Sequence, residues 1–151
     1  VILCGDVPLI TATTIGRLIE KHIQNDNDVT LLAVTVENPF GYGRVIQNEI
    51  GKVQAIVEEP DANADEKQID LINSGAYCVN RDFLELALSR VNSTNAQQEM
   101  YLTDIIKIGR LSGKKIGLFI LEDSSEVMGI NTGEDLQRVE AAIKARNLKM
   151  S

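Results

Sequence analysis

The sequence predicts an α/β fold in which a mixed, mostly parallel sheet is flanked by helices. Short β-branched apolar runs alternate along the chain with longer stretches whose apolar residues recur at helical spacing. The first elements follow the order strand, helix, strand, which implies a parallel, right-handed crossover. The 151 residues suffice for one hydrophobic core and are too few for two, so we expect a single domain.

The first three elements are a strand, a helix and a second strand. Residues 1–4 are apolar and predict a buried strand, which a turn over residues 5–8 ends. Thr11 is a natural N-cap for a helix over 12–24, along which apolar side chains recur at helical spacing. Residues 29–36 form a nearly continuous β-branched run, which is typical of a strand covered on both faces.

A hairpin and an exposed loop are expected next. Short strands over 44–47 and 52–58 surround a polar turn and so predict the hairpin. Residues 59–68 are mostly charged or amide-bearing, which favours a surface loop. The remaining elements are expected in this order: a strand over 72–79, helices over 81–91 and 100–111, a strand over 116–121, and a helix over 132–147 that Thr132 caps and whose inner face carries Leu136, Val139 and Ile143.

The composition argues against several classes of function. The chain has 22 acidic and 15 basic residues, a net charge of −7, so DNA or RNA would be repelled. Its apolar stretches fall well short of the roughly 18 residues that span a bilayer. Cys4 and Cys78 lack any C-x-x-C spacing, which indicates neither a zinc site nor a disulfide framework and favours the reducing cytoplasm. A phosphorylated small molecule remains compatible, because a metal ion or backbone N–H groups can hold it.

Two residues are candidate ligands for a metal ion. Asp6 follows the first strand, and ligands of open α/β sheets bind at the carboxyl ends of strands. Its carboxylate could hold a hard cation, although it could instead only shape the turn. Asn131 precedes the last helix and could supply a neutral oxygen ligand or simply begin that helix.

Other polar positions suggest binding of a sugar. Glu58 ends an otherwise apolar strand and Asn73 begins another, so a carboxylate and an amide could bind sugar hydroxyls. The alternatives are solvation of a sheet edge for Glu58 and an Asx-turn for Asn73. The glycines of Gly41-Tyr42-Gly43 could let the backbone approach a ligand or could serve a tight turn.

Two further groups have simpler expected roles. His22 lies at the edge of the apolar face of the helix over 12–24, which favours a packed imidazole over a catalytic base. Tyr101, Thr103 and Asp104 lie where a helix begins, and capping is their expected role.

Several motifs follow one another along nearly the whole chain. They are Leu3-Cys4-Gly5-Asp6-Val7-Pro8-Leu9, Pro39-Phe40-Gly41-Tyr42-Gly43-Arg44, Ile56-Val57-Glu58-Glu59, Ile72-Asn73-Ser74-Gly75, Glu99-Met100-Tyr101-Leu102-Thr103-Asp104 and Gly129-Ile130-Asn131. In order and spacing they resemble the bacterial bifunctional N-acetylglucosamine-1-phosphate uridyltransferase and glucosamine-1-phosphate acetyltransferase family.

The resemblance implies a Rossmann-like nucleotidyltransferase fold and a specific reaction. A uridylyl group passes from UTP to N-acetylglucosamine 1-phosphate with magnesium, giving pyrophosphate and UDP-N-acetylglucosamine, a precursor of peptidoglycan and lipopolysaccharide. By the same resemblance, the positions of Asp6 and Asn131 hold the metal. Those of Gly43, Glu58 and Asn73 contact the sugar nucleotide.

The resemblance also implies roles for Cys4 and Gly5, at the end of the first predicted strand and the start of the turn that follows it. Gly5 matches a glycine of the nucleotide site. Cys4 stands where the family often has a tyrosine, so the side-chain contact is altered while a backbone contact stays compatible.

Parts of the resembling family have no counterpart in this sequence. These are the N-terminal glycine-rich loop that wraps the triphosphate and the hexapeptide-repeat acetyltransferase domain, through which the full-length protein is expected to form a homotrimer. Because Val1 begins inside a strand, we expect the natural protein to have an upstream segment. The chain alone is therefore expected to be inactive. A nucleotidyltransferase of thymidylyl or guanylyl specificity and a non-catalytic sugar-nucleotide-binding module remain as alternatives.

Overall fold

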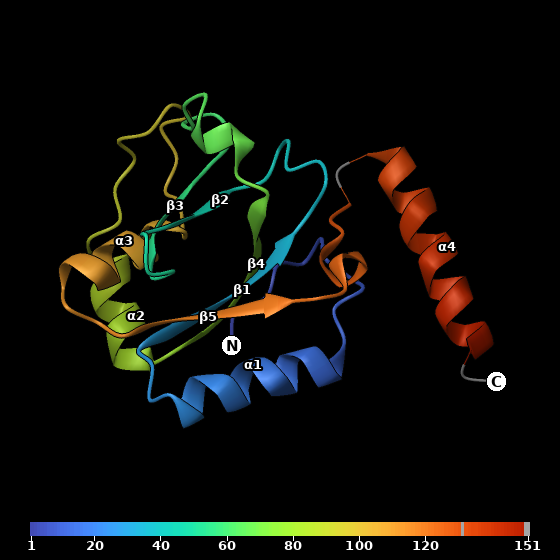
Figure 1. Cartoon of the computed structure of the whole chain (residues 1–151), viewed down its shortest axis with the longest axis horizontal. Coiled ribbons are helices and arrows are strands. Elements are labelled where there is room, and N and C mark those ends of the chain that lie inside the picture. The colour runs from blue at the N-terminus through green and yellow to red at the C-terminus, as the bar shows by residue number, and fades with distance from the viewer. Residues whose placement is uncertain (131, 150–151) are drawn as a thin grey trace.

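A mixed sheet of five strands lies at the centre of the fold, in the order β3-β2-β4-β1-β5 (Figure 1). The structure is a computed structural model that describes residues 1–130 and 132–149, with side chains described through residue 145. The strands are β1 (Val29–Thr35), β2 (Arg44–Gln47), β3 (Val53–Val57), β4 (Leu71–Val79) and β5 (Ile116–Leu121). The helices are α1 (Ala12–Gln24), α2 (Arg81–Leu88), α3 (Asp104–Leu111) and α4 (Gly133–Lys149), with short 3₁₀ helices η1 (Glu66–Gln68) and η2 (Ser124–Val127).

The mixed sheet with flanking helices confirms the expected class, but the balance of strand directions differs from the prediction. Among the described strands, β1 and β5 pair in parallel, whereas β1 with β4, β2 with β3 and β2 with β4 are antiparallel. Short connections can join only antiparallel neighbours, and β2, β3 and β4 follow one another without a crossover helix. The predicted hairpin of β2 and β3 is confirmed.

Both faces of the sheet are covered, which accounts for the continuous apolar run of β1. Val29, Leu31 and Ala33 pack in the core that α2 and α3 complete. Leu32 and Val34 face the opposite core, to which α1 contributes Leu18. Successive residues of a strand point to opposite faces, so a strand buried on both sides must be apolar at every position.

The prediction of a buried strand over residues 1–4 is wrong. Ile2 alone forms a bridge, exchanging backbone hydrogen bonds of 2.8 and 3.0 Å with Tyr77 of β4. Val1 and Leu3 are 55% and 43% exposed, because a single bridge to one neighbour does not cover both sides of the segment. Ile2 and β1 both pair antiparallel with β4. The segment at Ile2 and strand β1 therefore run in the same direction, as predicted, but β4 lies between them.

Elements with strong local signals lie where the sequence predicts them. Helix α1 spans Ala12–Gln24, and the Thr11 hydroxyl accepts a hydrogen bond of 3.1 Å from the Thr14 N–H as its N-cap. Strand β5 also keeps its predicted bounds. Helix α3 begins at Asp104, later than expected, and α2 ends at Leu88, earlier than expected.

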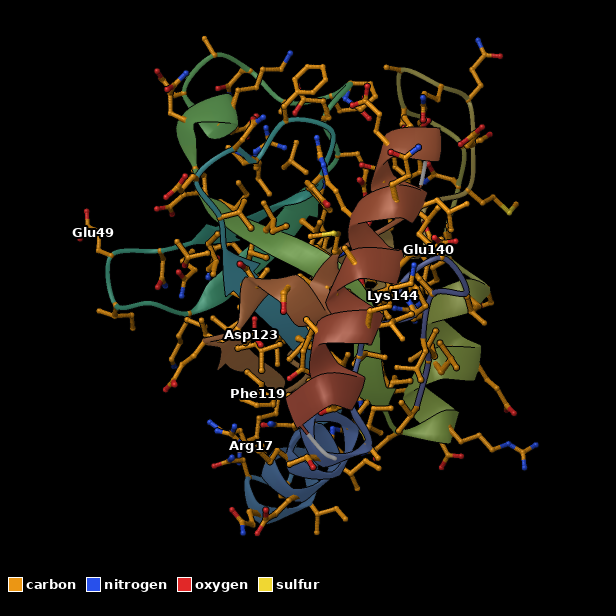
Figure 2. All side chains as sticks on the ribbon, turned by 90° about the vertical axis from the view of Figure 1, so that its right-hand side faces the viewer. Arg17, Glu49, Phe119, Asp123, Glu140 and Lys144 are labelled. Atoms are coloured by element: carbon orange, nitrogen blue, oxygen red, sulfur yellow. The ribbon has the colours of Figure 1, made fainter. Side chains whose placement is uncertain are left out.

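Helix α4 stands to one side of the sheet in Figure 1. Figure 2 looks onto this helix, with Glu140 and Lys144 labelled along it. Val139 is buried, but Leu136 and Ile143 are 45% and 41% exposed, which corrects the predicted inner face. None of the helices within the described residues has the length and apolarity that a bilayer crossing needs.

Candidate functional site

A cavity of about 610 Å³ gathers polar residues from distant parts of the sequence. It lies at the end of the sheet where β1 leads into the connection to β2, beside the first turns of α4. The residues predicted for the site that line it are Cys4, Asp6, Gly43, Glu58 and Asn73. Sequence reasoning therefore selected positions that the fold brings to one place.

The turn at Asp6 forms one wall of the cavity. Asp6 is exposed, and its backbone carbonyl accepts a hydrogen bond of 2.9 Å from the N–H of Ile130. The connection that follows η2 therefore returns to the turn at Asp6, although more than a hundred residues separate them. Asn131, the second predicted metal ligand, lies outside the described residues, so its sharing of a metal ion with Asp6 stays a prediction. Gly5 lies within the turn and is not among the lining residues.

Glu58 is held in place from two sides. One carboxylate oxygen accepts a hydrogen bond of 2.8 Å from the Thr103 hydroxyl at the start of α3. The other lies against Gly43, where an added Cβ would come within 3.0 Å of it and within 2.9 Å of Ile56 Cγ2. Glu58 is thus fixed at the cavity wall and does not merely solvate a sheet edge.

Asn73 is oriented by its own strand. Its Oδ1 accepts hydrogen bonds from the Tyr77 hydroxyl at 2.9 Å and from the Gly75 N–H at 3.2 Å, the second of which is the Asx-turn contact expected as an alternative. Its backbone N–H donates to the Gly43 carbonyl at 2.8 Å. With Oδ1 engaged, the Nδ2 hydrogens are the donors that this side chain can offer to a ligand.

Gly75 creates a local bulge that makes room for Cys4. The pairing of β1 with β4 shifts register between Leu31 and Ala33, opposite this part of β4. Gly75 has φ +77, and a Cβ there would clash with Cys4 Sγ. The Cys4 thiol donates to the Gly75 carbonyl at 3.5 Å. Burial raises the pKa of this thiol, and the nearby charges of Asp6 and Glu58 raise it further.

The loop of Gly41, Tyr42 and Gly43 rests on an ion pair between the buried Arg44 and the partly exposed Glu59. Arg44 is 1% exposed and places one guanidinium nitrogen 2.5 Å from Glu59 Oε2, while another donates to the Tyr42 carbonyl. Glu59 also accepts the Gly41 N–H at 3.3 Å. Gly41 has φ +85, a conformation that favours glycine. The hydrogen bond to Arg44 lowers the pKa of Glu59. Arg44 and Glu59 therefore fix the loop that lines the cavity.

His22 is packed, as predicted, and lies away from the cavity. Its ring nitrogens contact the Thr30 hydroxyl and the Asn80 side-chain oxygen, each at 3.1 Å. It is 6% exposed and is not among the residues that line the cavity.

Comparisons with known proteins identify the family. The sequence profile described as Nucleotidyl transferase matches residues 1–144 of this chain. The chain belongs to the nucleotidyl transferase family. Two curated relatives share its sequence closely, each named bifunctional protein GlmU. The relative from Clostridioides difficile strain 630 is 46% identical over 146 residues, covering 97% of this chain and 32% of the relative. The relative from Geotalea daltonii is 45% identical over 145 residues, covering 96% and 32%. This nucleotidyl transferase chain thus spans about a third of the length of these relatives.

A solved structure supports the nucleotidyl transferase fold. It belongs to a Bacillus anthracis protein described as a glucose-1-phosphate thymidylyltransferase, in complex with a sucrose. The TM-score is 0.60 and the sequence identity 22%, with 85% of this chain and 48% of the other covered. At this identity the likeness extends to the fold alone.

Sequence reasoning missed several residues that line this nucleotidyl transferase cavity or hold its wall in place. Thr103 was expected to cap α3, but its side chain makes no capping hydrogen bond and contacts Glu58 instead. Gly75 carried a usable signal, because a glycine inside a strand often marks a bulge. Asp135 and Arg138 also line the cavity, and nothing local marks them, because they reach it only through the placement of α4.

Proposed function

We propose that this chain forms the sugar-binding and metal-binding side of a uridyltransferase site. The reaction is transfer of a uridylyl group from UTP to N-acetylglucosamine 1-phosphate, giving UDP-N-acetylglucosamine and pyrophosphate. The observation that carries the proposal is the single cavity lined by Asp6, Gly43, Glu58 and Asn73. The likeness to GlmU proteins over nearly the whole chain supports the choice of substrates.

Three residues suit recognition of the sugar. The Glu58 carboxylate accepts hydrogen bonds from hydroxyl groups, and the Asn73 Nδ2 donates them. Gly43 keeps the backbone close to the ligand because it has no side chain, and its own Cβ position is already bounded by Glu58 and Ile56. The Thr103 hydroxyl holds Glu58 before the ligand arrives, so little reorganisation accompanies binding.

The donor chemistry at Asp6 fits magnesium. Within the described residues, no group of three or more His, Cys, Asp and Glu side chains could hold a metal ion. Mg²⁺ is commonly bound by one or two carboxylates together with substrate phosphates and waters, so one exposed carboxylate in a cavity for phosphates suits it. We propose that Asp6 holds the ion together with Asn131. When bound, magnesium neutralises phosphate charge during transfer.

The chemistry requires alignment more than proton removal. A sugar phosphate is already ionised, so its oxygen attacks the α-phosphorus of UTP directly. A new oxygen–phosphorus bond forms while the bond to the bridging oxygen of the β-phosphate breaks, and pyrophosphate leaves. The chain's own contribution is to orient the acceptor, through Glu58 and Asn73 on its hydroxyls.

The test compares binding with turnover. We expect the purified chain with Mg²⁺ to bind UDP-N-acetylglucosamine in calorimetry but to release no pyrophosphate from UTP and N-acetylglucosamine 1-phosphate. Fusing the chain to the glycine-rich N-terminal loop segment of the family that the sequence resembles should restore release with UTP, and dTTP or GTP should support much less. Binding that persists without any restored turnover would indicate a non-catalytic module. Preference for dTTP or GTP would indicate the other nucleotide specificities.

A further inference from the structure

The cavity carries an unusual balance of charges for a site that takes a phosphate. Three carboxylates line it, those of Asp6, Glu58 and Asp135. Among the described residues that line it, Arg138 is the one cation. Carboxylates that line the same cavity as a bound phosphate repel it, and a metal ion at Asp6 would offset only part of that repulsion. Arg138 is therefore the protein group best suited to attract an anionic ligand.

The first turn of α4 is fixed by a reciprocal cap. The Asp135 N–H donates to the Thr132 hydroxyl at 3.2 Å, and Asp135 Oδ2 accepts the Thr132 backbone N–H at 3.0 Å. This is the geometry of a capping box, which sets the direction in which a helix begins. Arg138 lies one turn further along, on the same face as Asp135, so the cap determines where its side chain reaches.

The guanidinium of Arg138 is only loosely held by its neighbours. Its nitrogens lie 3.8 Å from a Glu134 oxygen and 3.7 Å from an Asp135 oxygen, both longer than a hydrogen bond. The side chain is 65% exposed. The pair with Glu134 is exposed on both sides and contributes little, and the contact with Asp135 is too long for a hydrogen bond, so the guanidinium can turn toward a ligand at small cost.

Arg44 cannot take the same role, although it lies close to the loop that lines the cavity. Its guanidinium is buried and committed to Glu59 and to the Tyr42 carbonyl. Lys67 also faces Glu59, at 3.7 Å. These cations support the loop, so among the residues with described side chains Arg138 is the cation that lines the cavity.

We propose that Arg138 binds the phosphate group of a sugar 1-phosphate in this cavity. The inference rests on the proposed function and adds a phosphate-binding residue to it. The planar guanidinium matches two phosphate oxygens at once, which gives both affinity and orientation. Glu58 and Asn73 line the same cavity and suit sugar hydroxyls, so the phosphate in reach of Arg138 is the one attached to that sugar.

The experiment measures the affinity of the full 151-residue chain for two probes, N-acetylglucosamine 1-phosphate and N-acetylglucosamine, by calorimetry or NMR titration. For Arg138→Gln we expect affinity for the sugar phosphate to fall about tenfold or more, with affinity for the free sugar changed less than twofold. The affinity of Arg138→Lys for the sugar phosphate should lie between those of wild type and Arg138→Gln. Lysine keeps the positive charge but lacks the planar guanidinium that can bind two phosphate oxygens at once. The difference in sugar-phosphate affinity between wild type and Arg138→Gln should persist in EDTA, because the phosphate contacts the Arg138 side chain and not a metal ion.

Two control variants separate phosphate binding from a role within the helix. Arg81→Gln removes another exposed arginine from an i,i+4 pair and should leave both affinities unchanged. Glu134→Gln removes the neighbour of Arg138 and should leave the sugar-phosphate affinity equal or slightly higher, because the guanidinium loses a competitor.

Several outcomes would overturn the inference. Equal affinity of wild type and Arg138→Gln for the sugar phosphate would do so, as would an equal loss for both probes, which would indicate a structural effect. Weakened binding of UTP with unchanged binding of the sugar phosphate would assign Arg138 to the nucleotide instead. A wild-type chain that binds neither N-acetylglucosamine 1-phosphate nor UDP-N-acetylglucosamine would overturn the proposed function itself, and this inference with it.

Discussion

At the scale of single residues, the cavity depends on positions whose role is to leave room or to hold a neighbour. Gly43 makes space for Glu58, and Gly75 makes space for Cys4. Thr103 and Tyr77 each donate one hydrogen bond that orients a polar side chain of the wall. Gly75, Thr103 and Tyr77 have no ligand contact in the proposed reaction, yet they help to decide where Cys4, Glu58 and Asn73 lie.

Replacing Gly43 with alanine should weaken both ligand binding and the stability of the chain. The new Cβ would lie 2.9 Å from Ile56 Cγ2 and 3.0 Å from Glu58 Oε2, so Glu58 must move. We expect about a tenfold loss of affinity for UDP-N-acetylglucosamine and a loss of about 1–3 kcal/mol in the free energy of unfolding. Gly16→Ala is the matched control, because a Cβ at this helical glycine meets nothing within 4 Å. It should stabilise the chain by about 1 kcal/mol. Unchanged affinity in Gly43→Ala would show that Glu58 need not stay where it is.

Thr103→Val tests whether the hydroxyl matters because it holds Glu58. Valine keeps the shape but removes the donor, which leaves the buried side of the Glu58 carboxylate without its partner. Affinity for the sugar nucleotide should fall roughly fivefold to tenfold in a titration, which corresponds to about 1 kcal/mol. Thr103→Ser retains the hydroxyl and should stay near wild type. Equal losses in the two variants would assign the effect to packing.

At the scale of elements, local signals were enough for α1 and β5 but not for the first segment. The bounds of α1 follow from its own apolar periodicity and the Thr11 cap, both of which lie within the helix and its immediate flank. Whether residues 1–4 are buried depends on which strands lie beside them, and no pattern within four residues contains that information. The residues of the site likewise fall into those that local sequence predicts and those that it does not. Asp6, Glu58 and Asn73 could be predicted because each lies within or beside a short apolar run typical of a strand. Thr103 reaches Glu58, and Arg138 reaches the cavity, only through tertiary contacts.

The connection between β1 and β2 should depend on Arg44. Removing its guanidinium in Arg44→Met leaves Glu59 without its main partner and the Tyr42 carbonyl without its donor. We expect a lower free energy of unfolding in urea titration, because the buried Arg44 side chain loses its polar contacts, together with weaker sugar-nucleotide binding as the loop loosens. Arg81→Met removes an exposed ion pair and should change stability by about 0.5 kcal/mol or less. Similar small effects in both variants would contradict a supporting role for the pair of Arg44 and Glu59.

At the scale of the whole molecule, the two ends of the sheet serve different purposes. The cavity lies where β1 leads toward β2, and the opposite end is held together around Asp28. Asp28 Oδ2 accepts the Lys115 N–H at 2.9 Å, and Oδ1 lies 3.2 Å from Lys114 Nζ. Its backbone carbonyl accepts the Asn80 N–H at 2.9 Å. One residue thus joins the starts of β1 and β5 to the end of β4, remote from the site.

This arrangement predicts a dependence of stability on pH that leaves binding untouched. The Lys115 N–H, followed by Lys114, lowers the pKa of Asp28 in the folded chain below its ordinary value near 3.9. Because the folded state then binds the proton less readily than the unfolded state, Asp28 stabilises the fold above about pH 4. That contribution is lost as the pH falls through the lowered pKa.

Asp28→Asn should therefore lower the free energy of unfolding at pH 6 by about 1–2 kcal/mol. In urea titrations the gap from wild type should close toward pH 2. Glu49→Gln is the control for the loss of an exposed carboxylate, because Glu49 projects from the turn between β2 and β3 (Figure 2). The affinity of Asp28→Asn for the sugar nucleotide at pH 7 should equal that of wild type, since Asp28 is not among the residues that line the cavity. A gap that stays constant across pH would mean that the carboxylate stabilises the chain through packing, and a loss of affinity would mean that the two ends of the sheet are coupled.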